Sequence, residues 1–244
     1  MARAVGMDKR RHVAPPKEKL IISVIQQKGG AGKTTLAVHL AHMIADLRPQ
    51  WRVMIADADP QGSALNWISR GLEKGDQAVT ATPIARDGDG KGLRRELEAL
   101  EADVVIIDLP PAIEAISLRA ALYADIMLVP VGASPLDIEA AGAAVSVCQE
   151  AMSIDPRKTM ILVPSRIRSG TASARELRPV LERWGTVSQA SLSLRVAYSD
   201  AALSGEGIHS YAPASDAYRE MAHLAREVFT HIESRQEENA RQAL

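Results

Sequence analysis

The sequence is poor in cysteine, which excludes some classes of protein, and in aromatic side chains, which limits how the core can be built. Among 244 residues Cys148 is the only cysteine, which rules out an internal disulfide and leaves a zinc or iron–sulfur site within one chain without its usual thiolates. Aromatic residues make up only 3% of the chain, so the core must be built from aliphatic side chains, and the apolar fraction of 46% supplies enough of them. Cys148 itself is expected to be a small buried hydrophobe on a helix.

Long apolar runs and a strong net charge are also missing. No run of about 18 apolar residues occurs, so no transmembrane helix is expected, and residues 1–19 lack the apolar centre of a signal peptide. We therefore expect a cytoplasmic protein. The net charge of −1 gives no global attraction to nucleic acid. Locally, residues 1–19 hold six Lys or Arg against two acids, and residues 151–200 hold eight against four.

Three segments are expected along the chain. Residues 1–19 have the composition of a disordered basic leader ending in Pro15-Pro16, residues 20–233 that of a folded domain, and residues 234–244 that of a polar tail.

Short β-branched runs alternate with Ala- and Leu-rich stretches from residue 20 onward. Strands are expected over residues 20–26, 52–56, 79–84, 104–107, 126–131, 160–164 and 186–191. Helices are expected over residues 34–46, 92–101, 113–123, 135–152, 173–184 and 215–233. Most strands are continuously apolar, as in sheets covered on both faces. The pattern predicts an α/β fold with a single doubly wound, mainly parallel sheet and helices on both faces, which binds ligands at the carboxyl ends of its strands.

A glycine-rich loop with two lysines follows the first expected strand, with the sequence Gln27-Lys28-Gly29-Gly30-Ala31-Gly32-Lys33-Thr34-Thr35. Such loops close backbone N–H groups around phosphates, and the dipole of the following helix favours the anion. Lys33 can then reach the β/γ-phosphates while the Thr34 hydroxyl holds Mg²⁺. The usual pattern Gly-x-x-x-x-Gly-Lys-Ser/Thr is not met, because Gln27 replaces its first glycine and Lys28 adds a second lysine.

Carboxylates end two further expected strands. Asp57 and Asp59 are two residues apart and precede the turn Pro60-Gln61-Gly62. Two acids so close favour a bound cation, and Mg²⁺ beside a triphosphate would supply it, although an Asx turn with solvated acids is the alternative. Asp108 ends the apolar run of residues 104–107 and precedes Leu109-Pro110-Pro111, a placement typical of a carboxylate near the metal.

In this order and spacing the three motifs resemble the ParA/MinD family of deviant phosphate-loop (Walker A) ATPases. Lys28 stands where that family has its signature lysine, residues 57–62 look like its first switch, and residues 107–111 are similar to its second. Residues 129–137, 164–166 and 195–201 resemble the short plasmid-type ParA partition proteins, which lack an N-terminal DNA-reading domain. The resemblance covers about residues 20–232, so it identifies residues 20–233 as a ParA-type ATPase domain.

The resemblance implies ATP and Mg²⁺ as cofactors and a homodimer that forms on ATP, with Lys28 reaching the partner's nucleotide. It implies ATP binding by Lys28, Gly29, Gly30, Ala31, Gly32, Lys33, Thr34, Thr35 and Arg166. It implies a metal site at Thr34, Asp57, Asp59 and Asp108, and catalytic roles for Lys28, Lys33 and Asp59.

Partition ATPases of this family bind DNA nonspecifically and are stimulated by a ParB-like or adaptor protein, so the resemblance implies a nucleoid-associated protein with such a partner. The candidate DNA-binding residues are Arg168, Arg175, Arg178, Arg183 and Arg195, although an ordinary solvated helix face is the alternative for each. No membrane binding is expected, because residues 233–244 have neither an apolar stripe nor a basic excess. The plasmid, chromosome region or protein assembly that serves as cargo is not encoded in any motif.

Two other functions stay open at this stage. One is a MinD-like regulator at the membrane. The other is a metabolic phosphate-loop enzyme, such as a ligase related to dethiobiotin synthetase, although that class has no use for Lys28.

Overall fold

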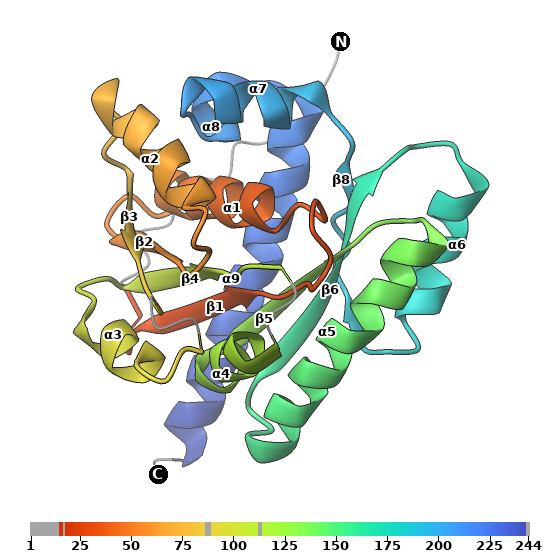
Figure 1. Ribbon diagram of the computed structural model, residues 1–244, viewed down its shortest axis with the longest axis horizontal. Coiled ribbons are helices and arrows are strands. Elements are labelled where there is room, and N and C mark those ends of the chain that lie inside the picture. The colour runs from red at the N-terminus through yellow and green to blue at the C-terminus, as the bar shows by residue number, and fades with distance from the viewer. Residues whose placement is uncertain (1–14, 17, 86–88, 112–113, 243–244) are drawn as a thin grey trace.

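The fold is a parallel sheet with helices on both faces (Figure 1). The structure is a computed structural model and describes residues 15–16, 18–85, 89–111 and 114–242, with side chains of the last helix as far as Ser234. Within these residues the strand order is β3-β2-β4-β1-β5-β6-β7, and β8 pairs with β6. All the paired strands are parallel, which confirms the doubly wound fold expected from the sequence.

The strands have the bounds β1 Leu20–Val24, β2 Val53–Asp57, β3 Val79–Pro83, β4 Val104–Asp108, β5 Ile126–Val131, β6 Thr159–Ile167, β7 Thr186–Val187 and β8 Leu192–Ser193. The helices have the bounds α1 Lys33–Leu47, α2 Ser63–Glu73, α3 Leu93–Ala99, α4 Glu114–Tyr123, α5 Pro135–Ile154, α6 Ala172–Leu181, α7 Val196–Ser204, α8 Ile208–Tyr211 and α9 Asp216–Gln242.

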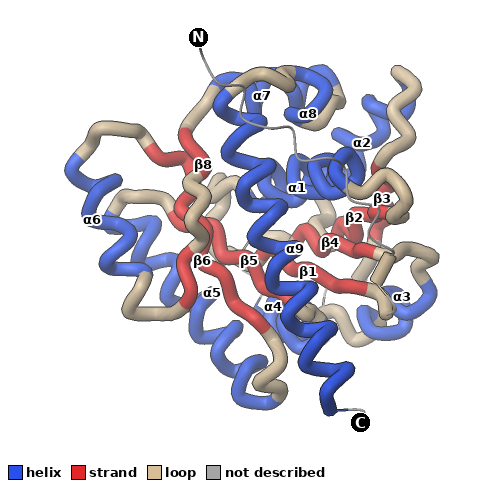
Figure 2. Tube along the Cα trace, turned by 180° about the vertical axis from the view of Figure 1, so that it is seen from behind, coloured by secondary structure: helices blue, strands red, loops and turns tan. Residues whose placement is uncertain are grey.

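Two hydrophobic layers hold the helices against the sheet. One layer joins the sheet to α1, α2, α7, α8 and α9, and Figure 2 shows α9 running across that face. The other layer joins the opposite face to α3, α4, α5 and α6 and contains the buried Cys148. The four central strands are almost entirely buried, which explains their continuous apolar sequences.

Three described helices were not expected from the sequence, namely α2, α7 and α8. The signal for α2 was present, because its buried residues Ala64, Trp67, Ile68 and Gly71 follow helical spacing. Instead of the strand expected over residues 186–191, the structure has two separate strands of two residues each, β7 and β8, and β8 begins directly after that range. These elements are short, and their positions depend on contacts with distant parts of the chain.

Both ends of the folded domain differ from the expected bounds. Lys19, which the sequence placed in the leader, donates from Nζ to the carbonyl oxygens of Leu97 (2.6 Å) and Glu98 (3.0 Å), and so caps the end of α3. Residues 1–14 and Lys17 of the expected leader lie outside the described residues, as does Ile113 of the expected helix over residues 113–123. The last helix continues to Gln242, through most of the segment expected to be a polar tail.

Candidate functional site

The glycine-rich loop lies at the carboxyl end of β1 and leads into α1. Ile25 donates its backbone N–H to Leu128 O (2.9 Å), and the buried Gln26 donates from Nε2 to Pro130 O (3.0 Å), so the start of the loop is tied to β5. Gly30 and Gly32 have φ values of 71° and 93°, a left-handed backbone that favours glycine. In the described part of the chain no side chain caps the N-terminus of α1, so its first N–H groups are left for an anion.

Lys33 is the buried lysine of the loop. It is 7% exposed, and its Nζ lies 3.4 Å from the carbonyl oxygen of Lys28, across the turn. Burial lowers the pKa of Lys33, while the nearby carboxylates of Asp108 and Asp59 oppose that shift. A cation enclosed by the loop in this way is placed to meet phosphate oxygens bound there.

Lys28 lies differently, with a half-buried side chain that reaches the first turn of α5. Its Nζ donates to Asp137 Oδ1 at 2.6 Å, and the two side chains are 36% and 24% exposed. Asp137 is in the first turn of α5. Its backbone N–H donates to the Ser134 hydroxyl oxygen, and its carboxylate accepts a hydrogen bond from that hydroxyl. Burial opposes the ionisation of Asp137, but the hydrogen bonds from Lys28 and Ser134 outweigh it and lower its pKa.

A glycine makes room for this ion pair. A Cβ on Gly132 would lie 2.4 Å from Asp137 Oδ2, so any side chain there would displace the carboxylate. Residues 129–137 resemble the family in sequence, but that resemblance gives Asp137 no role. Its contact with Lys28 spans 109 positions and could not be inferred from local pattern.

The three candidate metal-site aspartates are brought together by the register of the sheet. Asp57 pairs with Asp108 across β2 and β4, and Asp108 pairs with Val24, which ends β1 just before the loop. Asp57 accepts backbone N–H groups from Asp59 (3.0 Å) and Leu65 (2.9 Å), so it braces the turn and the start of α2. Asp59 accepts the N–H of Gln61 at 2.9 Å and is partly exposed. Burial raises the pKa of Asp57.

Asp108 is the buried acid without a structural partner. It is fully buried, and among the described residues neither carboxylate oxygen has a hydrogen bond of normal geometry, although Thr34 lies beside it. Burial raises the pKa of Asp108 to about 7, helped by Asp57 and Asp59 and opposed by Thr34 and Lys33. Two orphaned oxygens next to a threonine hydroxyl fit a hydrated Mg²⁺ that shares its ligands with a phosphate.

The acids do not form a complete metal site of their own. Within the described ranges no group of three His, Cys, Asp or Glu side chains is arranged to hold a metal ion. Mg²⁺ normally takes only one or two carboxylates and completes its shell with water and substrate phosphates, so this arrangement suits Mg²⁺ bound together with a nucleotide.

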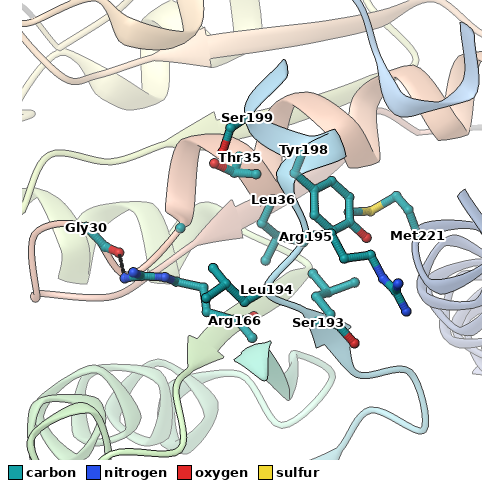
Figure 3. Close-up of a pocket in the computed structure, with 13 residues that line it drawn as sticks. Gly30, Thr35, Leu36, Arg166, Ser193, Leu194, Arg195, Tyr198, Ser199 and Met221 are labelled. Carbon is teal, nitrogen blue, oxygen red and sulfur yellow. Dashed lines mark hydrogen bonds between the residues drawn. The ribbon is translucent and has the colours of Figure 1, made fainter. Parts of the chain in front are cut away.

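A pocket of about 140 Å³ adjoins the loop (Figure 3). Its walls come from the loop and the start of α1, from Ser165 and Arg166 at the end of β6, from residues 192–195, and from Tyr198, Ser199 and Met221. Arg166 has a φ of 57°, unusual for a residue with a side chain, and donates from Nη1 to Gly30 O. The structure thus places Arg166 beside the loop, and its ATP contact stays a prediction.

The five arginines expected to bind DNA do not share one environment. Arg168, Arg175 and Arg183 are exposed on and around α6. Arg178 is partly buried, donates to Ser188 O and lies 3.9 Å from Glu182. Arg195 turns toward α9, away from Arg166 (Figure 3), with Nη2 2.8 Å from Glu220 Oε1 and Nη1 3.3 Å from Asp216 Oδ2. These ion pairs neutralise Arg195, so it is less available to a DNA phosphate than the exposed three.

Comparison with known proteins identifies the class to which this fold and loop belong. Residues 22–208 match the model of the CobQ/CobB/MinD/ParA nucleotide-binding domain. The chain therefore belongs to this family, and the sequence-based assignment to the ParA/MinD group is confirmed.

Individual relatives bear different names. The chain is 29% identical over 189 residues to maintenance of carboxysome distribution protein A of Halothiobacillus neapolitanus, covering 77% of this chain and 85% of the relative. It is 27% identical to the chromosome-partitioning ATPase Soj of Thermus thermophilus, covering 87% and 96% respectively. Cobyrinic acid a,c-diamide synthase of Mycobacterium smegmatis, solved with ADP and magnesium, has the same fold at 20% identity (TM-score 0.68, covering 89% of this chain and 96% of that one).

These similarities confirm the family and the fold, and the ATP and Mg²⁺ inferred from the motifs agree with them. At 20% identity the synthase shows the fold alone, and its presence means that the fold does not choose between a partition ATPase and a metabolic enzyme. In the described part of the chain no helix is both long and apolar enough to span a bilayer.

Proposed function

We propose that the protein is a partition or positioning ATPase that dimerises on Mg-ATP, binds DNA without sequence preference, and releases it after partner-stimulated hydrolysis. The observation that carries this proposal is the position of Lys28. Lys33 is buried in the loop, whereas the half-buried Lys28 pairs with Asp137 of α5. A second loop lysine whose ammonium group is held by another element would serve the nucleotide of a second copy, where it would stabilise the charge of the transition state.

The other residues have roles that follow from their positions. The loop amides, Lys33 and Thr35 would bind phosphate, and Thr34, Asp59 and Asp108 would hold the hydrated metal, with Asp57 bracing the turn beside them. Asp59, at the exposed edge of this group, would also orient the attacking water. Bound Mg²⁺ would neutralise charge developing on the phosphate oxygens. The pocket lined by Arg166 and residues 192–195 would take the base, because the loop and the start of α1 line it and none of the three acids does.

The output surface follows from the exposed arginines. Arg168, Arg175 and Arg183, doubled in a dimer, would bind DNA phosphates on the nucleoid, with Arg178 and Arg195 as lesser contributors. A ParB-like or adaptor protein would stimulate hydrolysis. The names of the relatives support two kinds of cargo, a carboxysome-like protein assembly and a chromosome or plasmid region.

The substitution Lys28→Ala tests this proposal. We expect the variant to bind a fluorescent ATP analogue with Mg²⁺ as the wild type does, since Lys33 and the loop are intact. It should lose ATP-dependent dimerisation in light scattering and most ATP hydrolysis. Lys91→Ala is the matched control, because Lys91 is also a lysine paired with an aspartate, Asp89.

Three results would contradict the proposal. Full hydrolysis by Lys28→Ala would remove the role of Lys28. ATP turnover by a monomer, accelerated by a small organic acid, would favour the metabolic alternative. ATP-dependent pelleting with lipid vesicles and no retention of DNA would favour the MinD-like alternative.

A further inference from the structure

Two glutamates of α9 hold the chain segment that leads from β7 to α7. Glu220 and Glu227 are seven residues apart and therefore lie on the same face of the helix. They are 16% and 17% exposed. Each accepts several hydrogen bonds from this segment, and the two sets of contacts do not overlap.

Glu220 binds the part of the segment that lines the pocket beside the loop. It accepts the backbone N–H of Ser193 (3.0 Å), the Ser193 hydroxyl (2.7 Å), Arg195 Nε (3.0 Å) and Arg195 Nη2 (2.8 Å). The Tyr198 hydroxyl lies 3.3 Å from Glu220 Oε2 and 3.0 Å from Ala217 O. Ser193, Arg195 and Tyr198 all line the pocket (Figure 3).

Glu227 makes a similar set of contacts away from the pocket. It accepts the Ser188 hydroxyl (2.6 Å) and the backbone N–H groups of Gln189 (3.1 Å) and Ala190 (2.9 Å). None of these three residues lines the pocket. Both glutamates therefore hold the segment to α9, but only Glu220 does so through residues that line the pocket.

We propose that Glu220 is a positioning residue for the nucleotide base and sets the preference of the site for ATP over GTP. This inference rests on the proposed function, which places the base in this pocket. Glu220 does not line the pocket and would act through Ser193, Arg195 and Tyr198. Adenine and guanine present opposite hydrogen-bond donors and acceptors on one edge. Pocket residues that are held in one position discriminate against the mismatched base more strongly than residues that can shift to accommodate it.

Both the charge and the shape of the Glu220 carboxylate are needed to hold the pocket residues in position. An ionised carboxylate only accepts hydrogen bonds, and Glu220 receives only donors. In Glu220→Gln an amide N–H₂ would face the N–H groups of Ser193 or Arg195, and Arg195 would keep only Asp216 as a carboxylate partner. The wall would then loosen without any change in a residue that lines the pocket.

The experiment compares the wild type with Glu220→Gln, Glu227→Gln and Ser193→Ala, using equilibrium binding of fluorescent ATP and GTP analogues with Mg²⁺ and thermal unfolding. For Glu220→Gln we expect ATP affinity to fall about tenfold, the scale of losing charged hydrogen bonds, and the ratio of ATP to GTP affinity to shrink with it. Glu227→Gln should lower the unfolding temperature similarly yet change both affinities less than about twofold. Ser193→Ala removes one contact and keeps the Arg195 pair, so it should shift the ratio in the same direction even if Glu220→Gln fails to fold.

Results that differ from these expectations would overturn either this inference alone or the proposed function as well. If the wild type binds both nucleotides and the ratio is unchanged in Glu220→Gln and Ser193→Ala, the inference is overturned while the proposed function stands. Equal losses for both nucleotides in Glu220→Gln and Glu227→Gln would show a purely structural role and would also overturn it. A wild type that binds neither nucleotide would overturn the proposed function and this inference together.

Discussion

At the scale of single residues, His39 shows how burial fixes a protonation state. It lies in the middle of α1 and is fully buried, with Nε2 3.3 Å from Tyr198 O and Nδ1 accepting the backbone N–H of Ile208 at 3.1 Å. Since Nδ1 accepts, the ring proton is on Nε2 and the imidazole is neutral. Burial lowers the pKa of His39 to about 3, and the neighbouring His42 and His209 add to the effect, against the hydrogen bond to Tyr198.

This pKa makes the protein sensitive to mild acid. Between about pH 6.5 and 3 the unfolded chain binds a proton at His39 that the folded chain does not, so the free energy of unfolding falls as the pH falls. We expect the wild type to lose about 2 kcal/mol from this group between pH 7 and 5, and His39→Gln to lack that loss. Urea unfolding at pH 7, 6 and 5 measures the difference in slope.

Comparing the two slopes isolates His39. Asp108, with a pKa raised to about 7, stabilises the fold in acid and acts in the opposite direction, but it is the same in both proteins. Asp76, with a pKa lowered to about 2 by its hydrogen bond with His42, loses its contribution only below the range measured. The exposed His223 provides a control substitution to Gln. Parallel slopes for the wild type and His39→Gln would contradict the assigned role.

At the scale of elements, α2 packs closely against the end of α7, a contact that was not expected from the sequence. A Cβ on Gly71 would lie 2.5 Å from the carbonyl oxygen of Gly205. Three donors on one face of α2 reach carbonyl oxygens at and beyond the C-terminal end of α7, namely Trp67 Nε1 to Glu206 (3.2 Å), Arg70 Nη2 to Ala202 (2.9 Å) and Lys74 Nζ to Ser204 (2.6 Å). These bonds satisfy carbonyls that a helix end leaves free.

Two glycine substitutions within helices should therefore have opposite effects. Gly71→Ala puts a methyl group against backbone and should lower the free energy of unfolding by about 1–3 kcal/mol. Gly142→Ala in α5 meets nothing within 4 Å and should raise it by up to about 1 kcal/mol, because alanine favours the helix. Chemical denaturation of both variants measures the difference. A Gly71→Ala protein as stable as the wild type would show that α2 and α7 are not closely packed.

Which elements the sequence could predict depends on where their stability comes from. The long central strands and the glycine-rich loop carry their signals locally, as the buried run of residues 104–107 and the glycines before Lys33 show. By contrast, α2 contains Gly71, which looks like a helix breaker until Gly205 is seen against it. The partner of Lys28 and the partners of Glu220 are far away in sequence, so only the folded chain reveals them.

At the scale of the whole molecule, the distribution of basic residues predicts how DNA binding depends on salt. Each phosphate contact contributes about 0.9 to the slope of log K against log salt concentration, so Arg168→Ala in an ATP-bound dimer should reduce the slope by about 2. Fluorescence anisotropy with a DNA duplex at several salt concentrations measures this slope.

The matched control lies at the other end of β6. Arg157 precedes that strand and is paired with Asp155, Nε to Oδ1 at 2.9 Å, so Arg157→Ala should leave the slope unchanged. Unchanged slopes in Arg168→Ala, Arg175→Ala and Arg183→Ala would place the DNA surface outside these three arginines.

The scarcity of aromatic residues has a practical consequence for spectroscopy. The chain has only three tryptophans, and Trp67 is buried on α2, with its ring edge-on to His39 at a centroid distance of 4.9 Å. The helix that carries it begins directly after the turn of Asp57 and Asp59. A shift of that turn which moves α2 relative to α1 and α7 would change the surroundings of this indole. Its ultraviolet emission is therefore an unlabelled optical signal for the state of the turn, read against a background of only two other tryptophans.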